Sequence, residues 1–268
     1  MVNSVPTKKS LGQHWLNDSV ALHSMVRAGN VQPGTDVLEI GPGTGTLTEV
    51  LLDAGANVIA IEQDDRLIEM LGQKFNGRDF RIEHIDILKL DLTALPANYT
   101  VVANIPYYLT SKLIRTLLES TNPPLRTVIL VQKEVAERVA AVPGKMSLLS
   151  VASQFYATVE LDMVVPARLF EPRPKVDSQI LVLDRREEAL FNSEEFDKKL
   201  FFRIIKAGFS SRRKTLLNSL SGGLRMPKVA TEKALRLAEV PPTIRPQELS
   251  IEKWHDIYLE YKKYEQTA

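Results

Sequence analysis

The sequence predicts an α/β fold in which a mostly parallel sheet of seven strands is followed by a small helical C-terminal domain. Between Asp36 and Val131, short runs rich in Val and Ile alternate with longer amphipathic stretches. This alternation is typical of repeated βαβ units around a parallel sheet. After Asp184 the apolar residues recur with helical spacing instead. We therefore place the domain boundary near Arg185 and expect two domains, 1–185 and 186–268.

Seven runs are predicted to be strands. Five of them succeed one another in the first half of the chain: Asp36–Ile40, Asn57–Ile61, Phe80–Glu83, Thr100–Ala103 and Thr127–Val131. Two more, Val159–Val164 and Gln179–Leu183, flank a Pro-rich segment. Because the Pro-rich segment Val165–Asp177 joins them directly, these two strands are able to pair as an antiparallel hairpin.

The C-terminal part is predicted to be helical. Five apolar residues share one face of a helix: Phe196, Leu200, Phe201, Ile204 and Ile205. The pairs Gly222-Gly223 and Pro241-Pro242 are predicted to interrupt the helices.

Charge is divided unevenly along the chain, although the net charge is only +1. Residues 1–185 carry 18 Lys and Arg against 21 Asp and Glu, whereas residues 186–268 carry 16 against 12. Between Lys198 and Thr231 there are nine cationic residues and no acidic one. Such a block is typical of a phosphate-binding surface, and a solvated helix face is the alternative.

Composition excludes several classes of protein. The chain has 268 residues, of which 44% are hydrophobic and 25% are charged, as in ordinary globular domains. The absence of cysteine excludes disulfides, thiolate metal sites and a cysteine nucleophile. Neither a signal peptide nor an apolar run of about 18 residues is present. We expect a monomeric cytoplasmic protein that does not enter a membrane.

A glycine-rich loop follows the first predicted strand. Three glycines alternate in Gly41-Pro-Gly-Thr-Gly45, and Glu39 lies two residues before them. A dinucleotide-binding loop requires a third small residue three places after the second glycine, but in either register that place holds a threonine, Thr46 or Thr48. The pattern therefore disfavours a nicotinamide dehydrogenase. It favours a ligand without phosphate, such as S-adenosylmethionine in a Rossmann-like sheet, and a turn without a ligand is the alternative.

Two carboxylates follow the next strands. Glu62 comes directly after the second strand, where it could accept hydrogen bonds from both ribose hydroxyls of a nucleoside. Asp86 follows the third strand and could accept from an adenine amino group. A charge at a helix N-terminus and a simple cap are the respective alternatives.

The run Asn104-Ile105-Pro106-Tyr107 follows the fourth strand and is the most specific feature of the chain. An exocyclic amine on a purine is a poor nucleophile because its lone pair is delocalised into the ring. Two acceptors, the Asn104 side-chain oxygen and the Ile105 carbonyl, could hold its hydrogens and localise that lone pair. Tyr107 offers a face on which an adenine could stack. Alignment of the reactants, rather than a strong base, would then supply most of the rate.

With these motifs the chain resembles the small-subunit (16S) ribosomal RNA adenine dimethyltransferase family of the KsgA type. The resemblance runs over nearly the whole chain. It includes four further segments: Lys9–Leu16, Gln132–Arg138, Phe170–Ser178 and Phe209–Leu216. It implies a Rossmann-like seven-stranded methyltransferase sheet and a ribosome-biogenesis enzyme. Such an enzyme uses S-adenosylmethionine, without a metal, to dimethylate the amino groups of two adjacent adenosines near the 3′ end of 16S rRNA in a pre-small-subunit particle.

The resemblance also implies roles for individual residues. The cofactor-binding residues would be His14, Leu16, Gly41, Gly43, Glu62, Asp86 and Asn104. The catalytic residues would be Asn104, Tyr107 and Phe170, with Phe170 on the other face of the flipped adenine from Tyr107. Without the resemblance, Phe170 would be interpreted as a core residue. The basic C-terminal domain would bind RNA phosphates through Lys206, Arg212, Arg213 and Lys214.

Two positions depart from the family pattern. Trp15 stands where the family usually has Phe, and the segment Lys145–Val151 lacks the Tyr-Gly pair that usually precedes Leu-Ser-Val. The first change alters bulk on a segment expected to close over the cofactor. The second is expected to affect substrate recognition and not the cofactor site.

Two other functions compete with this one. An antibiotic-resistance methyltransferase acting on large-subunit RNA would share the catalytic motifs, but the segments Phe170–Ser178 and Phe209–Leu216 resemble the small-subunit group. An RNA-binding assembly factor with vestigial methylation would not need an intact glycine loop, Glu62 and Asn104.

Overall fold

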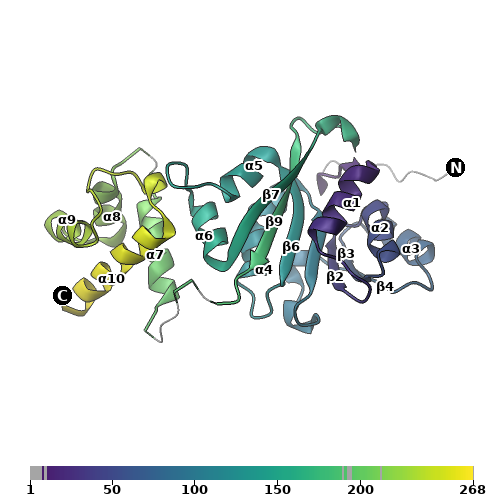
Figure 1. The fold of residues 1–268 in the computed structure, drawn as a ribbon, viewed down its shortest axis with the longest axis horizontal. Helices are drawn as coiled ribbons and strands as arrows, with labels where there is room; N and C mark the ends of the chain where they lie inside the picture. The colour runs from purple at the N-terminus through teal and green to yellow at the C-terminus, as the bar shows by residue number, and fades with distance from the viewer. Residues whose placement is uncertain (1–7, 9–10, 189, 192–194, 212, 268) are drawn as a thin grey trace. The chain divides into compact units, whose positions relative to one another are not determined.

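A computed structural model describes residues 8, 11–188, 190–191, 195–211 and 213–267 (Figure 1). The chain forms two compact units. The first contains the described residues up to Glu137 together with Tyr156–Glu187, and the second contains Arg138–Phe155 together with the described residues from Glu188 onward. Residues 138–155 thus group with the C-terminal unit, whereas the sequence-based division assigned them to domain 1–185. The functional roles of the two predicted domains stay predictions.

The first unit is built on a seven-stranded sheet, as predicted. Its strands are β2 (Asp36–Ile40), β3 (Asn57–Glu62), β4 (Phe80–His84), β5 (Thr100–Asn104), β6 (Arg126–Gln132), β7 (Ala157–Val165) and β9 (Ser178–Arg185). Their order across the sheet is β4-β3-β2-β5-β6-β9-β7. The first five strands are parallel, and β9 and β7 form the expected antiparallel hairpin at one edge. Each predicted strand is therefore present, longer by one or two residues at an end in most cases.

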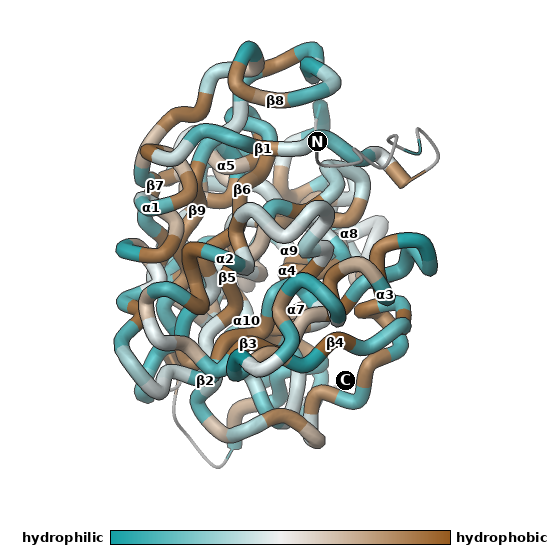
Figure 2. The backbone as a smooth tube through the Cα atoms, turned by 90° about the vertical axis from the view of Figure 1, so that its right-hand side faces the viewer, coloured by the Kyte–Doolittle hydropathy of each residue, from teal (hydrophilic) through white to brown (hydrophobic). Residues whose placement is uncertain are grey.

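Helices α2 (Thr46–Asp53), α3 (Asp65–Lys74) and α4 (Thr110–Leu118) connect parallel strands, α1 (Ser19–Ala28) precedes β2, and α5 (Lys133–Val139) follows β6. Each of these helices buries apolar residues. One core cluster joins apolar residues of α1, α2 and α3 to residues of β2, β3, β5, β6 and β9. Figure 2 shows hydrophobic stretches along strands such as β6 and β9, while many connecting loops are hydrophilic. This burial fixes the carboxyl ends of the strands, where ligands bind in such sheets.

A second, very small sheet was not predicted. Strand β1 (Trp15–Leu16) pairs antiparallel with β8 (Phe170–Glu171), and Leu16 lies opposite Phe170. The pairing attaches the N-terminal segment to the Pro-rich segment between β7 and β9. Two-residue strands carry no periodic sequence pattern, so the sequence gives no local signal for them.

The second unit is helical, as predicted. It contains most of α6 (Leu148–Tyr156) and α7 (Lys198–Gly208), α8 (Leu216–Leu224), α9 (Lys228–Leu237) and α10 (Ile251–Thr267). Four of the five residues of the predicted apolar face lie in α7 and are buried, whereas Phe196 precedes the helix and is partly buried. Trp254 and Tyr258 of α10 lie in the same unit with less than 2% exposure. None of the helices within the described residues is long and apolar enough to cross a membrane.

The prediction that Gly222-Gly223 interrupts a helix is wrong. Both glycines lie inside α8, which ends after Leu224. A Cβ atom at Gly223 would lie 2.6 Å from the Cβ of Ala207 in α7. The glycine therefore permits the close approach of two helices, and this packing outweighs its low helix propensity.

Candidate active site

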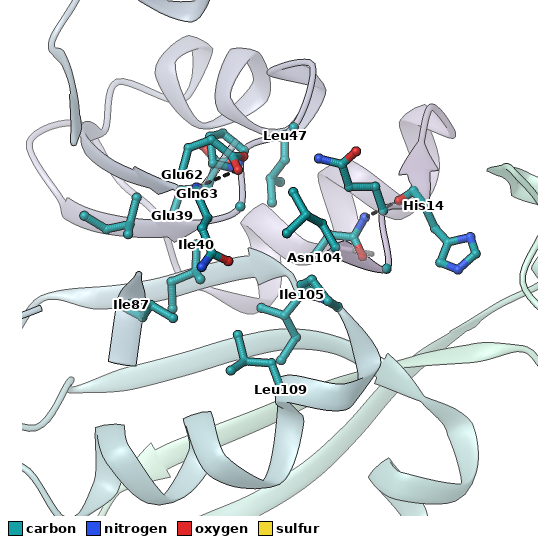
Figure 3. A pocket seen from close by; sticks show the side chains of 18 of the residues that line it. His14, Glu39, Ile40, Leu47, Glu62, Gln63, Ile87, Asn104, Ile105 and Leu109 are labelled. Carbon is teal, nitrogen blue, oxygen red and sulfur yellow. Dashed lines mark hydrogen bonds between the residues drawn. The ribbon is translucent and has the colours of Figure 1, made fainter. Parts of the chain in front are cut away.

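A pocket of about 280 Å³ lies at the carboxyl ends of the parallel strands (Figure 3). Its size is close to the lower end of the range for small-molecule sites. Eight of the residues predicted from the sequence line it: His14, Leu16, Gly41, Gly43, Glu62, Asp86, Asn104 and Tyr107. The structure thus brings together residues from the N-terminal segment, from the glycine loop and from the ends of three strands.

The glycine loop adopts backbone conformations that other residues rarely tolerate. Gly41, Gly43 and Gly45 all have positive φ angles of 69°, 57° and 79°. A Cβ atom at Gly43 would lie 2.4 Å from a ring carbon of Trp15, whereas one at Gly41 would meet no atom within 4 Å. Trp15 therefore covers the loop at Gly43. At Gly41 the loop is open, and a ligand can approach the backbone there.

Glu62 is fixed at the end of β3 by the backbone that follows it. Its Oε1 atom accepts hydrogen bonds from the backbone N–H groups of Gln63 (2.7 Å) and Asp64 (2.8 Å). The side chain is 6% exposed. Burial raises the pKa of Glu62, and hydrogen bonds from the backbone of Asp64, Gln63 and Gly43 oppose that rise. The carboxylate is thus an oriented acceptor in the pocket wall.

Asp86 both caps a short helix and lines the pocket. Its side chain accepts from the backbone N–H of Leu88 at 3.0 Å, at the start of the 3-10 helix η2 (Ile87–Lys89). The cap that the sequence analysis treated as an alternative is present. It uses Oδ1, and no hydrogen bond to Oδ2 is found within the part of the chain that the structure describes. Capping and ligand binding are therefore compatible at this residue.

Glu39 is a third pocket carboxyl, and in the sequence it stands out only as part of the glycine-loop pattern. Its side chain is 1% exposed, and its Oε2 atom accepts from Thr48 Oγ1 at 2.7 Å. Burial raises the pKa of Glu39 to about 8. Its position in a strand, two residues before Gly41, was the available signal, because alternate residues of a strand share a face.

Asn104 holds its amide in one orientation at the end of β5. Its Nδ2 atom donates to the backbone carbonyl of His14 at 3.2 Å, as the dashed line in Figure 3 marks. Among the described residues, no donor reaches Asn104 Oδ1 or the carbonyl oxygen of Ile105. Two adjacent acceptors at the pocket are thus without a partner in the part of the chain that the structure describes. An amine with two hydrogens is the complementary group.

Tyr107 is held at both ends. Its ring stacks with that of His14 at a centroid distance of 5.8 Å and an angle of 23°, and its Oη atom hydrogen-bonds Ser178 Oγ at 2.8 Å. Burial raises the pKa of the phenol. His14 Nδ1 in turn donates to the carbonyl of Pro172 at 2.6 Å. The aromatic face predicted from the sequence is therefore rigidly supported.

Phe170 is placed differently from the other predicted residues. It is 5% exposed, belongs to the core cluster of the first unit, and is not among the pocket-lining residues. This is the core position that its sequence context alone suggested. Contact between Phe170 and a substrate base stays a prediction.

Three of the four predicted RNA-binding cations are described. Lys206, Arg213 and Lys214 are exposed in the second unit, and Arg212 lies outside the described residues. Within those parts of the chain, no ion pair involves any of the three. Arg203, from the same block, is paired with Glu265 at 3.1 Å. The block thus contains both paired and free cations.

The segment Lys145–Val151, which departs from the family pattern, is held within the second unit. Met146 N and Gly144 N both donate to the carbonyl of Gln247, at 3.0 and 2.9 Å. The shorter segment is therefore anchored by its backbone.

A seven-stranded sheet in which only β9 is reversed, with a pocket built from a glycine loop and strand ends, is the architecture of a Rossmann-like methyltransferase. The family model described as ribosomal RNA adenine dimethylase matches residues 5–263. The chain belongs to this family, which confirms the resemblance found in the sequence. It is an enzyme of the ribosomal RNA methyltransferase class.

Individual relatives agree with this assignment. Ribosomal RNA small subunit methyltransferase A of Dehalococcoides mccartyi strain CBDB1 is 40% identical over 263 residues, covering 96% of this chain and 89% of the relative. The protein of the same name from Streptococcus agalactiae serotype V is 40% identical over 91% of this chain and 88% of its own length.

Solved structures are similar over the same length. The 23S rRNA methyltransferase ErmE has a TM-score of 0.75 at 28% identity, covering 92% of this chain and 99% of its own. A dimethyladenosine transferase from Plasmodium falciparum has a TM-score of 0.76 at 26% identity, with coverages of 92% and 97%.

Proposed function

We propose that this enzyme uses S-adenosylmethionine to dimethylate the exocyclic amino groups of two adjacent adenosines near the 3′ end of 16S rRNA. The observation that carries the proposal is the pair of acceptors at Asn104 and Ile105, which no donor of the described residues reaches. The names of the 40% identical relatives support the small subunit as the substrate. The place of action would be the cytoplasm, and the enzyme would act as a monomer during subunit biogenesis.

The pocket fits S-adenosylmethionine, which supplies an electrophilic methyl group when bound. The open side of the loop at Gly41 would take the methionine part, and the oriented Glu62 carboxylate would accept from the ribose hydroxyls. Asp86 would accept from the cofactor's adenine amino group through its second oxygen. His14, Leu16 and the other predicted cofactor residues would close around it. This donor set requires no metal.

Asn104 would orient the substrate amine. Because its Nδ2 atom donates to the His14 carbonyl, Oδ1 is the amide atom left to accept from the amine. The Ile105 carbonyl would accept the second hydrogen. Held by two acceptors, the amine nitrogen would become pyramidal and keep its lone pair available, so no strong base is needed.

The substrate adenine must leave its stack to reach this pocket. We propose that Tyr107 supports one face of the flipped base and Phe170 the other, after a local rearrangement that exposes Phe170. Cations of domain 186–268 would hold RNA phosphates, while domain 1–185 performs the transfer. Phosphate contacts alone carry little sequence information. We therefore propose a partly assembled small subunit, which presents an unstacked loop in one orientation, as the preferred substrate.

Labelled S-adenosylmethionine tests this proposal directly. The purified enzyme is offered naked 16S rRNA, unmethylated small subunits and large subunits, and methyl groups are counted per adenine by mass mapping. We expect two methyl groups on each of two adjacent adenines, with higher yield on the small-subunit particle. Label confined to large-subunit RNA, or a product that stops at monomethyladenine under excess cofactor, would overturn the assignment.

The phosphate-binding role of the free cations is tested by a triple change of Lys206, Arg213 and Lys214 to Ala. We expect weaker RNA binding and a smaller salt dependence, because each lost phosphate contact removes roughly 0.7–0.9 from the log–log slope. Filter binding at several salt concentrations measures this slope. Affinity for S-adenosylmethionine should stay unchanged.

A matched control removes three cations of the same unit that are already ion-paired. These are Arg236, Lys253 and Lys263, which pair with Glu232, Asp256 and Glu260, respectively. The control should keep the salt slope of the wild type. Equal slopes in all three proteins would identify Lys206, Arg213 and Lys214 as an ordinary solvated surface.

A further inference from the structure

Asp64 is a charged side chain buried outside the pocket. It is the N-cap of α3, it is 0% exposed, and it does not belong to the pocket lining. Its Oδ1 atom accepts from Lys8 Nζ and Arg66 Nε, each at 2.9 Å, and its Oδ2 atom accepts from Gln13 Nε2 at 3.1 Å and Arg66 Nη2 at 2.6 Å. Both carboxylate oxygens are therefore fully used.

Two of these partners come from the N-terminal segment, more than 50 positions away in sequence. Lys8 and Gln13 are also joined to each other, since the backbone N–H of Lys8 donates to Gln13 Oε1 at 2.6 Å. We define the flap as residues Leu11–Leu16, all of which line the pocket. The flap is thus attached to Asp64 through Gln13, and Lys8 attaches the chain just before the flap. The last residue of the flap is attached to the start of α2, directly after the glycine loop, because Thr46 Oγ1 donates to the Leu16 carbonyl at 2.9 Å.

Asp64 is also connected to Glu62, a carboxylate that lines the pocket. The backbone N–H of Asp64 donates to Glu62 Oε1 at 2.8 Å. One residue therefore binds the flap with its side chain and orients a pocket carboxylate with its backbone. A shift of Asp64 would move both.

Helix capping alone does not account for this arrangement. The capping hydrogen bond, from Arg66 N to Asp64 Oδ1, is 3.3 Å long, whereas the bonds to Lys8 and Arg66 side chains are 2.9 Å or shorter. The Arg66 guanidinium, and then Lys8 and Gln13, hold the pKa of Asp64 well below its usual range despite burial. A cap requires neither the lysine nor the glutamine.

We propose that Asp64 is a positioning residue that latches the flap over the cofactor pocket and so determines how tightly the cofactor is retained. It touches neither cofactor nor substrate but acts through Gln13 and Glu62. The inference rests on the proposed use of S-adenosylmethionine and adds a residue to the machinery that retains it. Cofactor release then requires the hydrogen bonds from Lys8 and Gln13 to Asp64 to break.

Asp64→Asn tests the latch, because the neutral amide keeps the size of the side chain but cannot hold two cations. Calorimetry with S-adenosylhomocysteine should show about tenfold weaker binding, as expected for loss of one charge-assisted hydrogen bond. Hydrogen exchange should become faster in residues 11–16, and exchange in the sheet should stay unchanged. A helix cap without a latching role would leave the flap's exchange at the wild-type rate.

Asp65→Asn is the matched control. Asp65 is the next residue, its side chain is 72% exposed, and it contacts the same Lys8 Nζ atom at 3.4 Å. This variant should keep wild-type affinity and wild-type exchange. Equal weakening in both variants would attribute the effect to general charge near α3 and would overturn the latch.

Lys8→Met is used if Asp64→Asn fails to fold. It removes the ammonium group that donates to Asp64 and leaves α3 and Arg66 intact. We expect the same faster exchange in the flap and weaker binding of S-adenosylhomocysteine. Normal affinity and normal flap exchange in this variant would overturn the latch. Failure of the wild type to bind S-adenosylhomocysteine would instead overturn the proposed function, so the two failures are distinguishable.

Discussion

Replacing Asn104 by Ala is expected to lower the rate of methyl transfer by about 10²–10³-fold, the usual effect of removing one aligned electrostatic contact. The change removes the Oδ1 acceptor and frees the His14 carbonyl from its hydrogen bond with Nδ2. Single-turnover transfer of labelled methyl groups to small subunits measures the effect. RNA affinity and melting temperature should change little, because the side chain is only partly buried.

Asn104→Asp separates the two functions of the amide. It keeps oxygen acceptors for the amine but cannot donate to His14. We expect it to retain more activity than the Ala variant and less than the wild type. Near-normal turnover of Asn104→Ala would show that the residue does not orient the amine.

The second large effect concerns Glu39 and the pH dependence of folding. Its pKa is about 8 in the folded protein and near 4.5 when exposed. A group whose pKa is raised by folding holds its proton in the native state, so its contribution is complete below pH 4.5 and declines as the pH rises toward 8. At about 1.4 kcal/mol per pH unit, the loss amounts to a few kcal/mol.

Glu39→Gln should remove this loss, since a neutral amide can still accept from Thr48 Oγ1. We expect the variant and the wild type to have similar free energies of unfolding at pH 5. At pH 9 the variant should be the more stable by a few kcal/mol. Urea unfolding without ligand at several pH values measures the difference. A difference that does not change with pH would contradict the assignment of a buried, protonated Glu39.

The strands and the pocket residues were largely predictable because each has a local signal. The alternation of Val- and Ile-rich runs with amphipathic stretches marks the strands, and side chains directly after parallel strands meet at one edge of the sheet. This is how Gly41, Glu62 and Asn104 could be placed together.

The remaining features depend on contacts between distant parts of the chain. Nothing near Asp64 in sequence indicates that Lys8 and Gln13 approach it, and nothing near Trp15 indicates its pairing opposite Glu171. Gly223 was misinterpreted for the same reason, because its role is set by Ala207 on another helix.

The contact between Trp15 and Gly43 makes the residue tolerated at one position depend on the residue at the other, although the two lie 28 positions apart. Since a Cβ atom at Gly43 would lie 2.4 Å from the Trp15 ring, any side chain at position 43 requires the indole to shift. The indole ring is thus a second reason for glycine at position 43, in addition to the positive φ angle of that residue. A smaller ring at position 15 would remove this contact, and the φ of 57° would then be the remaining constraint on position 43.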